Sequence, residues 1–182
     1  MERELGRLVE IFISPSKGEP MQSEKSLMAI AGFGLAGDRY AEGKGAYSGS
    51  KTMPDDDRQV SLISLQAIYQ ANRILVEVGK TFSPKETRRN LLLDITSEDL
   101  NNLVGKRFLL GEVEMEGASL CDPCTRPGLV LGRETKDAKA FEEAFAGRGG
   151  LRARIITGGV LTVLDELRLI LEPEYPVSLL RG

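Results

Sequence analysis

Short apolar segments, separated by glycine-rich or acidic turns, run through the whole chain, and this pattern most constrains the fold. Such segments are typical of β-strands. The predicted strands are residues 6–14, 22–30, 60–64, 88–95, 107–120 with a turn at Gly111, 152–157, 160–163 and 167–171. Helical spacing of apolar residues occurs in 65–79 and 136–146, and a capping pattern at Thr96 predicts a short helix ending near Gly105. The sequence therefore predicts a mainly β fold with helical insertions, a single β-barrel-like domain.

The chain has 182 residues, a length that fits one domain with a sizeable core. Residues 32–50 contain six glycines and are predicted to form a loop. There is no internal repeat and no linker long enough to divide the chain. We therefore expect a single domain over residues 1–182.

Histidine is absent from the sequence. This absence excludes Ser-His-Asp and Cys-His catalysis, HExxH metal sites and mixed Cys/His zinc sites. Cys121 and Cys124 are the sole cysteines, so one chain cannot form a four-cysteine zinc ribbon. Any chemistry must come from thiols, carboxylates, cations, hydroxyl groups or a borrowed cofactor.

The charge balance gives no support for a nucleic-acid or membrane partner. There are 24 Lys and Arg residues against 27 Asp and Glu residues, and the net charge is −3. The N-terminus alternates charges and lacks the apolar core of a signal peptide. The longest weakly polar stretch, 28–37, is about half of what a membrane span needs. We expect a soluble cytoplasmic protein.

The segment CDPC, residues 121–124, is the most informative part of the chain. Two thiols at this spacing indicate redox chemistry, soft-metal ligation or sulfur transfer, because a thiolate is both a nucleophile and a soft ligand. A thioredoxin-type pair opens a helix, whereas here Pro127 and Gly128 follow closely, which counts against that class. The simpler interpretation is two buried cysteines without chemistry.

Basic residues near glycines form the second signal. Arg39 follows a glycine turn, Arg88 and Asn90 open a predicted strand, and Arg126 lies two residues beyond Cys124. Arg148, Arg152 and Arg154 surround Gly149-Gly150. If these loops converge on Cys124, their guanidinium groups form an anion pocket, because guanidinium matches phosphate oxygens. The acidic run 55–57 is interpreted as a solvated loop tip in preference to a cation site, and its role stays open.

These motifs together resemble one family. GLAGDRY (34–40), RRN (88–90), CDPC (121–124) and RGGLRARIITGG (148–159) look like the MOSC domain, the C-terminal module of molybdenum cofactor sulfurases, here in a stand-alone bacterial-type form. The resemblance covers about residues 6–171, with 172–182 as a C-terminal tail. It implies a β-barrel of the pyruvate-kinase barrel type.

The resemblance also implies two alternative functions. Some members are proposed to carry sulfur as a cysteine persulfide for metal–sulfur centres. Others bind the molybdenum–molybdopterin cofactor through a cysteine and reduce N-hydroxylated substrates. Cys124 matches the position of the catalytic or metal-ligating cysteine. Arg39, Arg88, Asn90 and Arg126 are the expected cofactor-binding residues, whose task is to hold the phosphate and the pterin edges.

This chain departs from the family pattern at Tyr40, where relatives often carry histidine. It contains no pyridoxal phosphate site, so sulfur would come from a cysteine desulfurase partner, and a reductase would need an electron-transfer partner. Two rival functions stay open: a thiol–disulfide oxidoreductase using Cys121 and Cys124, and a non-enzymatic module that binds anions or a partner.

Overall fold

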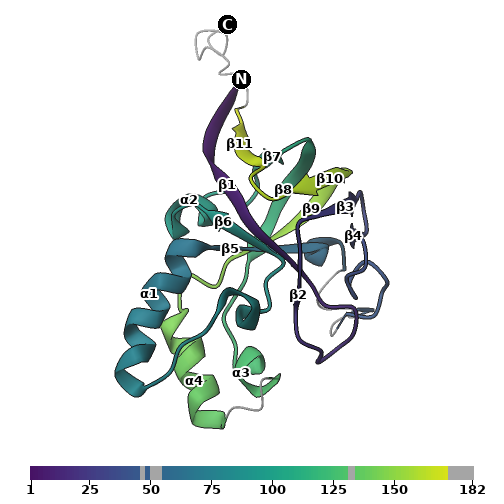
Figure 1. Ribbon diagram of the computed structural model, residues 1–182. Coiled ribbons are helices and arrows are strands. Elements are labelled where there is room, and N and C mark those ends of the chain that lie inside the picture. The colour runs from purple at the N-terminus through teal and green to yellow at the C-terminus, as the bar shows by residue number, and fades with distance from the viewer. Residues whose placement is uncertain (46–47, 50–54, 131–133, 172–182) are drawn as a thin grey trace, which may run out of the picture.

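A closed β-barrel forms the centre of the molecule (Figure 1). The computed structural model describes residues 1–45, 48–49, 55–130 and 134–171, so the predicted tail 172–182 lies outside the described residues. Within them, seven strands follow one another around the barrel in the order β1, β11, β7, β8, β9, β5, β6, and β6 pairs with β1 again. All neighbours are antiparallel except β5 and β6. The predicted mainly β barrel is thereby confirmed.

The bounds of the barrel strands agree closely with the apolar segments of the sequence. They are β1 (Glu2–Ile13), β5 (Val60–Ser64), β6 (Leu91–Asp94), β7 (Arg107–Leu110), β8 (Val113–Leu120), β9 (Leu151–Thr157) and β11 (Glu166–Ile170). The predicted strand 88–95 is shorter in the structure, because the RRN segment precedes β6 instead of belonging to it.

A small second sheet lies beside the barrel and consists of β10 (Gly159–Thr162), β3 (Ser26–Ile30) and β4 (Gly34–Leu35). The predicted strand 22–30 is divided at Lys25. Its first part, β2 (Gln22–Glu24), pairs with β1, whereas β3 pairs with β10. The predicted 32–50 loop contains the short strand β4.

The helices cover one side of the barrel. They are α1 (Leu65–Leu75), α2 (Ser97–Asn101), α3 (Arg126–Val130) and α4 (Thr135–Ala144), with 3-10 turns η1 (Asp55–Arg58), η2 (Val76–Val78) and η3 (Pro84–Thr87). The hydroxyls of Ser64 and Thr96 cap α1 and α2 as their sequences predict. Gly79 ends the α1–η2 segment in the left-handed region. The sequence did not predict α3, η1 or η3.

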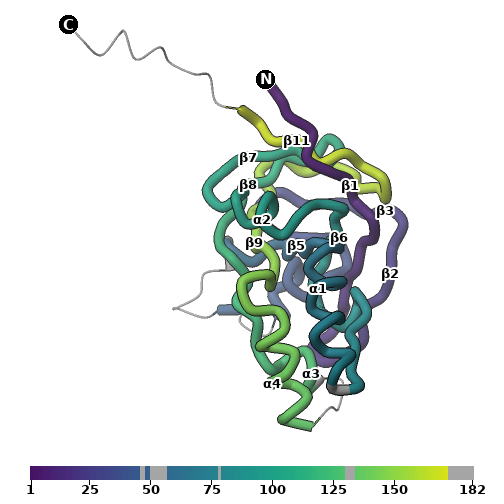
Figure 2. The backbone as a smooth tube through the Cα atoms, turned by 90° about the vertical axis from the view of Figure 1, so that its left-hand side faces the viewer, coloured from purple at the N-terminus to yellow at the C-terminus, as the bar shows by residue number. Residues whose placement is uncertain are grey.

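Two apolar cores hold these layers together. One fills the barrel with leucines, isoleucines and valines, together with Phe108 and Met115. The other lies between the barrel and the helices α1 and α4, which run side by side (Figure 2). Phe141 is central to it, with its ring centroid 4.4 Å from that of Phe82 and 4.5 Å from that of Phe145. No helix among the described residues is long and apolar enough to span a membrane.

Candidate functional site

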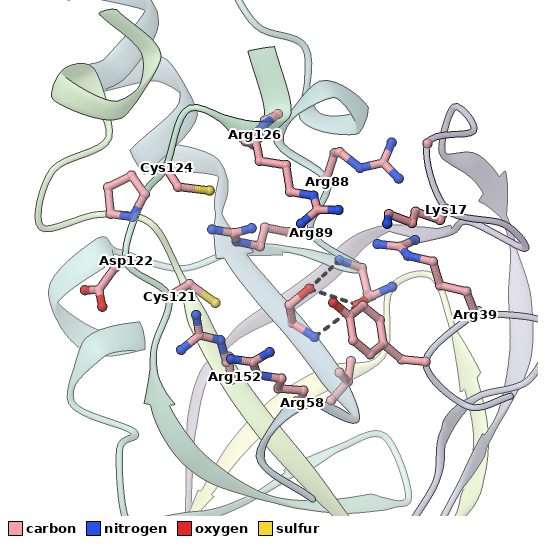
Figure 3. A pocket seen from close by; sticks show the side chains of 17 residues that line it. Lys17, Arg39, Arg58, Arg88, Arg89, Cys121, Asp122, Cys124, Arg126 and Arg152 are labelled. Carbon is pink, nitrogen blue, oxygen red and sulfur yellow. Dashed lines mark hydrogen bonds between the residues drawn. The ribbon is translucent and has the colours of Figure 1, made fainter. Parts of the chain in front are cut away.

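A cavity of about 540 Å³ lies where the loops following β1, β4 and β8 meet the starts of β5, β6 and β9 (Figure 3). Its size is within the range of small-molecule and cofactor sites. The lining residues are Lys17, Gly18, Arg39, Tyr40, Arg58, Val60, Ser61, Arg88, Arg89, Asn90, Cys121, Asp122, Pro123, Cys124, Arg126, Pro127 and Arg152. All five predicted site residues, Cys124 among them, are therefore brought together in one cavity.

The cavity is strongly cationic although the whole chain is acidic. Among the described residues, seven lysines and arginines line it against one carboxylate, the exposed Asp122. Cations gathered in a concave site of low dielectric create a positive potential that attracts anions. The site is thus built for an anionic ligand.

Below the cavity, Asn90 and the buried Asp38 link three chain segments. The Asn90 Oδ1 accepts hydrogen bonds from the backbone N–H and the hydroxyl of Ser61. Its Nδ2 donates to the carbonyl of Phe12 and to Asp38 Oδ2. Asp38 also accepts from the backbone N–H groups of Ser14 and Tyr40. The side-chain amide of Asn90 is thus bonded to four protein atoms, and this network holds the floor of the cavity in place.

Arg88 is held in an unusual backbone conformation at the cavity wall. Its φ is +60°, in the left-handed region that non-glycine residues rarely occupy, and such strain is concentrated at functional sites. Its guanidinium donates to the Glu19 carbonyl at 2.8 Å and to the Ser14 hydroxyl at 3.3 Å. Burial lowers the pKa of Arg88, and the nearby charges of Arg39 and Arg126 lower it further. An anion bound here would relieve this repulsion.

Arg39 is buried next to these groups. Its Nη1 donates to the Ser14 carbonyl at 3.4 Å and lies 3.9 Å from Asp38 Oδ2. The guanidinium is also 5.1 Å from the centroid of the Tyr40 ring, a cation–π distance. The Tyr40 ring therefore lies against a cavity cation.

Four lining cations were not among the expected cofactor-binding residues: Lys17, Arg58, Arg89 and Arg152. Arg152, and Arg89 as part of the RRN segment, do belong to the basic residues that the sequence predicts to form an anion pocket. Arg89 donates from Nε to the Gly149 carbonyl at 2.8 Å. Arg152 donates from Nη1 to the Leu120 carbonyl at 3.0 Å and to the Ser119 hydroxyl. Arg152 follows the glycine pair in the sequence. Because side chains alternate along β9, Arg152 lies on the face opposite the buried Leu151, and both features can be recognised in the sequence. Lys17 precedes Gly18, a similar signal, whereas no such pattern identifies Arg58.

The two cysteines differ in exposure. Both are free thiols; Cys121 is buried and Cys124 is exposed. The Cys121 N–H donates to the Gly150 carbonyl at 2.7 Å, and a Cβ on Gly149 would overlap the Cys121 carbonyl oxygen. Only glycine permits this approach. Figure 3 shows both thiols at one side of the cavity. The five-residue helix α3 begins two residues after Cys124.

The remaining predicted features lie outside the cavity. Asp57 Oδ1 accepts hydrogen bonds from both Nε and Nη2 of Arg154, whose Nη1 donates to Glu116. Part of the acidic run thus anchors η1 to the barrel, while the side chains of Asp55 and Asp56 lie outside the described residues. Arg148 and Arg154 do not line the cavity. Among the described residues, no three Cys, Asp or Glu side chains cluster as metal ligands.

Comparison with known proteins identifies the domain type. The sequence model of the MOSC domain matches residues 49–168, more than half of the chain. No curated protein matched significantly.

Solved structures share the fold at low sequence identity. The YuaD protein from Bacillus subtilis is 20% identical with a TM-score of 0.73, covering 93% of this chain and 98% of that one. YiiM from Escherichia coli is 18% identical with a TM-score of 0.60, covering 92% and 71%. YiiM from Geobacillus stearothermophilus is 12% identical with a TM-score of 0.57, covering 94% and 76%. At these identities the likeness is one of fold.

Proposed function

We propose that this chain, which belongs to the MOSC domain family, binds a molybdenum–pterin cofactor in the cationic cavity, with the Cys124 thiolate as the metal ligand. The observation that carries this proposal is the presence of an exposed thiol and seven cations in one cavity. A thiolate is a soft ligand for a metal, and guanidinium groups are suited to phosphate oxygens.

The residues of the cavity fit such a group in charge and in chemistry. Arg39, Arg88 and Arg126 are the side chains that would hold the phosphate, because their mutual repulsion is relieved by a dianion. Asn90 supports the site through Ser61 and Asp38, since its amide is already bonded to protein atoms. When bound, the metal would supply redox chemistry such as the reduction of N-hydroxylated compounds, with electrons delivered by a partner protein.

A second candidate function is sulfur transfer, favoured by the exposure of Cys124. In this reaction the Cys124 thiolate attacks the outer sulfur of a persulfide on a cysteine desulfurase. The sulfur–sulfur bond of the desulfurase breaks, its cysteine leaves as a thiolate, and Cys124 becomes the persulfide. No net oxidation occurs, because the sulfane sulfur only changes carrier.

The test is the molybdenum and sulfur content of protein purified without oxygen from a molybdenum-replete host. We expect about one molybdenum per chain in the wild type and none in Cys124→Ser. Because Cys124 is exposed, the free energy of unfolding of this variant should change by less than about 0.5 kcal/mol. Elemental analysis and denaturant unfolding measure the two quantities.

Cys121→Ser is the matched control. It should load molybdenum normally, with about 1–2 kcal/mol lost in stability because a hydroxyl replaces a buried thiol. Normal loading of Cys124→Ser would overturn the cofactor proposal. A reducible adduct of one sulfur mass on Cys124, without molybdenum, would favour sulfur transfer. Loss of thiol–disulfide exchange activity in both cysteine variants, with a reversible Cys121–Cys124 disulfide in the wild type, would favour the thiol–disulfide oxidoreductase.

A further inference from the structure

Six of the seven cations that line the cavity among the described residues fall into two groups, and Figure 3 shows the seventh, Arg89, between Arg126 and Arg152. Lys17, Arg39, Arg88 and Arg126 form one, here called the Arg88 group, and Arg58 and Arg152 form the other, the Arg152 pair. Figure 3 shows the Arg152 pair on the side of Cys121, and Lys17 and Arg39 on the far side. Arg126 belongs with Arg88 because its charge lowers the pKa of Arg88 and because α3 contacts η3.

The order of the barrel strands separates Lys17 and Arg88 from Arg152, whereas Arg126 follows β8, the neighbour of β9. Lys17 follows β1 and Arg88 precedes β6, whereas Arg152 lies on β9. The strands run β1, β6, β5, β9, β8 across the floor. Because neighbouring strands are about 4.8 Å apart, β1 and β9 are separated by roughly 14 Å along the sheet. Between the groups lie the neutral Ser61 and Asn90, and Ser61 is directly opposite Arg152. A phosphate held by Lys17 and Arg39 therefore lies on the other side of the cavity from Arg152.

Arg152 is fixed in place without a compensating negative charge. Its hydrogen-bond partners, the Leu120 carbonyl and the Ser119 hydroxyl, are neutral. Among the described residues, the single acid of the cavity is the exposed Asp122. The bond to Leu120, the residue before Cys121, holds the guanidinium at the level of the buried thiol. Four cations of the Arg88 group already exceed the charge of one phosphate, which is about −2.

We propose that the Arg152 pair is a second anion subsite, which binds a phosphate or carboxylate group beside Cys121 while the Arg88 group holds the first. The identity of the second anion rests on the proposed function, in which the Arg88 group holds the cofactor phosphate. The anion at the Arg152 pair is then part of an anionic substrate or a second phosphate of the cofactor. In both cases the chemistry recognised is the same: an oxyanion bound by guanidinium.

The experiment is a titration of cofactor-free protein with inorganic phosphate at constant ionic strength, followed by NMR of the arginine side-chain Nε–H groups. The Nε–H signal of Arg88 reports on phosphate bound at the Arg88 group, and that of Arg58 reports on phosphate bound at the Arg152 pair. We expect both signals to shift with separate midpoints. Arg152→Gln should weaken binding at Arg58 about tenfold or more, since it removes a charge-assisted bond, and leave the Arg88 midpoint within twofold. Arg39→Gln should have the converse effect.

Matched controls guard against an effect of charge or of folding. Arg73→Gln changes the same charge on the exposed face of α1 and should leave both midpoints unchanged. Arg152→Lys keeps a cation at the site if Arg152→Gln fails to fold. The proposal is overturned if the Arg58 signal does not respond to phosphate. It is also overturned if Arg152→Gln and Arg39→Gln each change the Arg58 and Arg88 midpoints equally.

The same titration on cofactor-loaded protein identifies the source of the second anion. A continued response of Arg58 to phosphate assigns the subsite to an anionic substrate. Loss of both responses assigns it to the cofactor's own second phosphate. If the protein loads no cofactor, the proposed function fails, while the titration of the cofactor-free protein still decides whether the second subsite exists.

Discussion

At the residue scale, Asn90 has a role that its position in a strand-opening motif does not reveal. Its amide joins Ser61 on β5, the Phe12 carbonyl on β1 and the buried carboxylate of Asp38. Without Asn90 these groups would lose hydrogen-bond partners in a poorly hydrated place, which is costly, although Asp38 would keep its bonds from Ser14 and Tyr40. Asn90 therefore acts on a ligand through the residues it positions.

Asn90→Ala should reduce the free energy of unfolding by about 2–4 kcal/mol, because several buried polar groups lose their partners. Ser61→Ala removes only the hydroxyl bonds with Asn90 and should cost about 1–2 kcal/mol. Urea denaturation of the two variants beside wild type measures the difference. An effect of Asn90→Ala under about 0.5 kcal/mol would contradict the role of this network.

The predicted site residues were found because their residue types are unusual for the places they occupy. A cysteine pair flanked by Asp and Pro, and arginines directly beside glycine turns, are visible in the sequence. Arg58 was not predicted because its immediate neighbours do not mark it. Lys17 precedes Gly18, a signal of the same kind that the prediction did not use. Both residues line the cavity through the pairing of β5 with β9 and through the course of the loop after β1. Roles in binding remain predictions for all of these residues.

At the element scale, α4 depends on the aromatic cluster that joins it to α1 and to the segment after η2. Phe141 lies between Phe82 and Phe145 and is 2% exposed. The helix follows the cysteine loop and α3, and α3 and α4 are in contact. Packing of Phe141 therefore stabilises the side of the molecule from which Cys124 and Arg126 enter the cavity.

Phe141→Ala should cost about 3–5 kcal/mol of unfolding free energy, because it leaves a cavity in a well-packed cluster. Phe33→Ala is the control, since Phe33 is 63% exposed and the change should stay within about 0.5 kcal/mol. Thermal and urea denaturation provide the comparison. Equal effects of the two substitutions would show that α4 does not depend on this cluster.

Element boundaries were predictable where apolar spacing and caps coincide, as in α1 and in the β7–β8 hairpin at Gly111. The division of residues 22–30 was not, because it reflects a change of sheet: β2 pairs with β1, whereas β3 pairs with β10. The short helix α3 was missed because Pro127 and Gly128 have low helix propensity.

At the scale of the whole molecule, charge is segregated. The chain carries a net charge of −3 and has 24 lysines and arginines, yet seven of those that the structure describes line one cavity. The rest of the protein is correspondingly more acidic. Such an arrangement concentrates the positive potential at the cavity and steers anions to it.

Phosphate should consequently stabilise the protein more than chloride does at the same ionic strength. At ten times its dissociation constant, a ligand that binds only the folded state contributes about 1.4 kcal/mol. For a chain of this size, that raises the melting temperature by roughly 3–5 °C. Differential scanning calorimetry in the two salts measures the shift. The shift should become smaller in Arg88→Gln, because binding at the Arg88 group is lost, and should persist in full in Arg73→Gln; an equal response to both anions would refute specific binding.

The sequence by itself determined the type of fold and the chemical groups at issue. Strand periodicity, helix caps and glycine turns are local properties, and the CDPC and RRN segments reveal thiols and cations without reference to distant residues. Only the tertiary structure decided that the loops after β1, β4 and β8 and the starts of β5, β6 and β9 share one cavity. It also decided that Cys121 is buried while Cys124 is exposed, and that Arg152 lies across the cavity from Lys17 and Arg39. The physical reason is that strand order and register are set by barrel closure, through contacts between residues far apart in the chain.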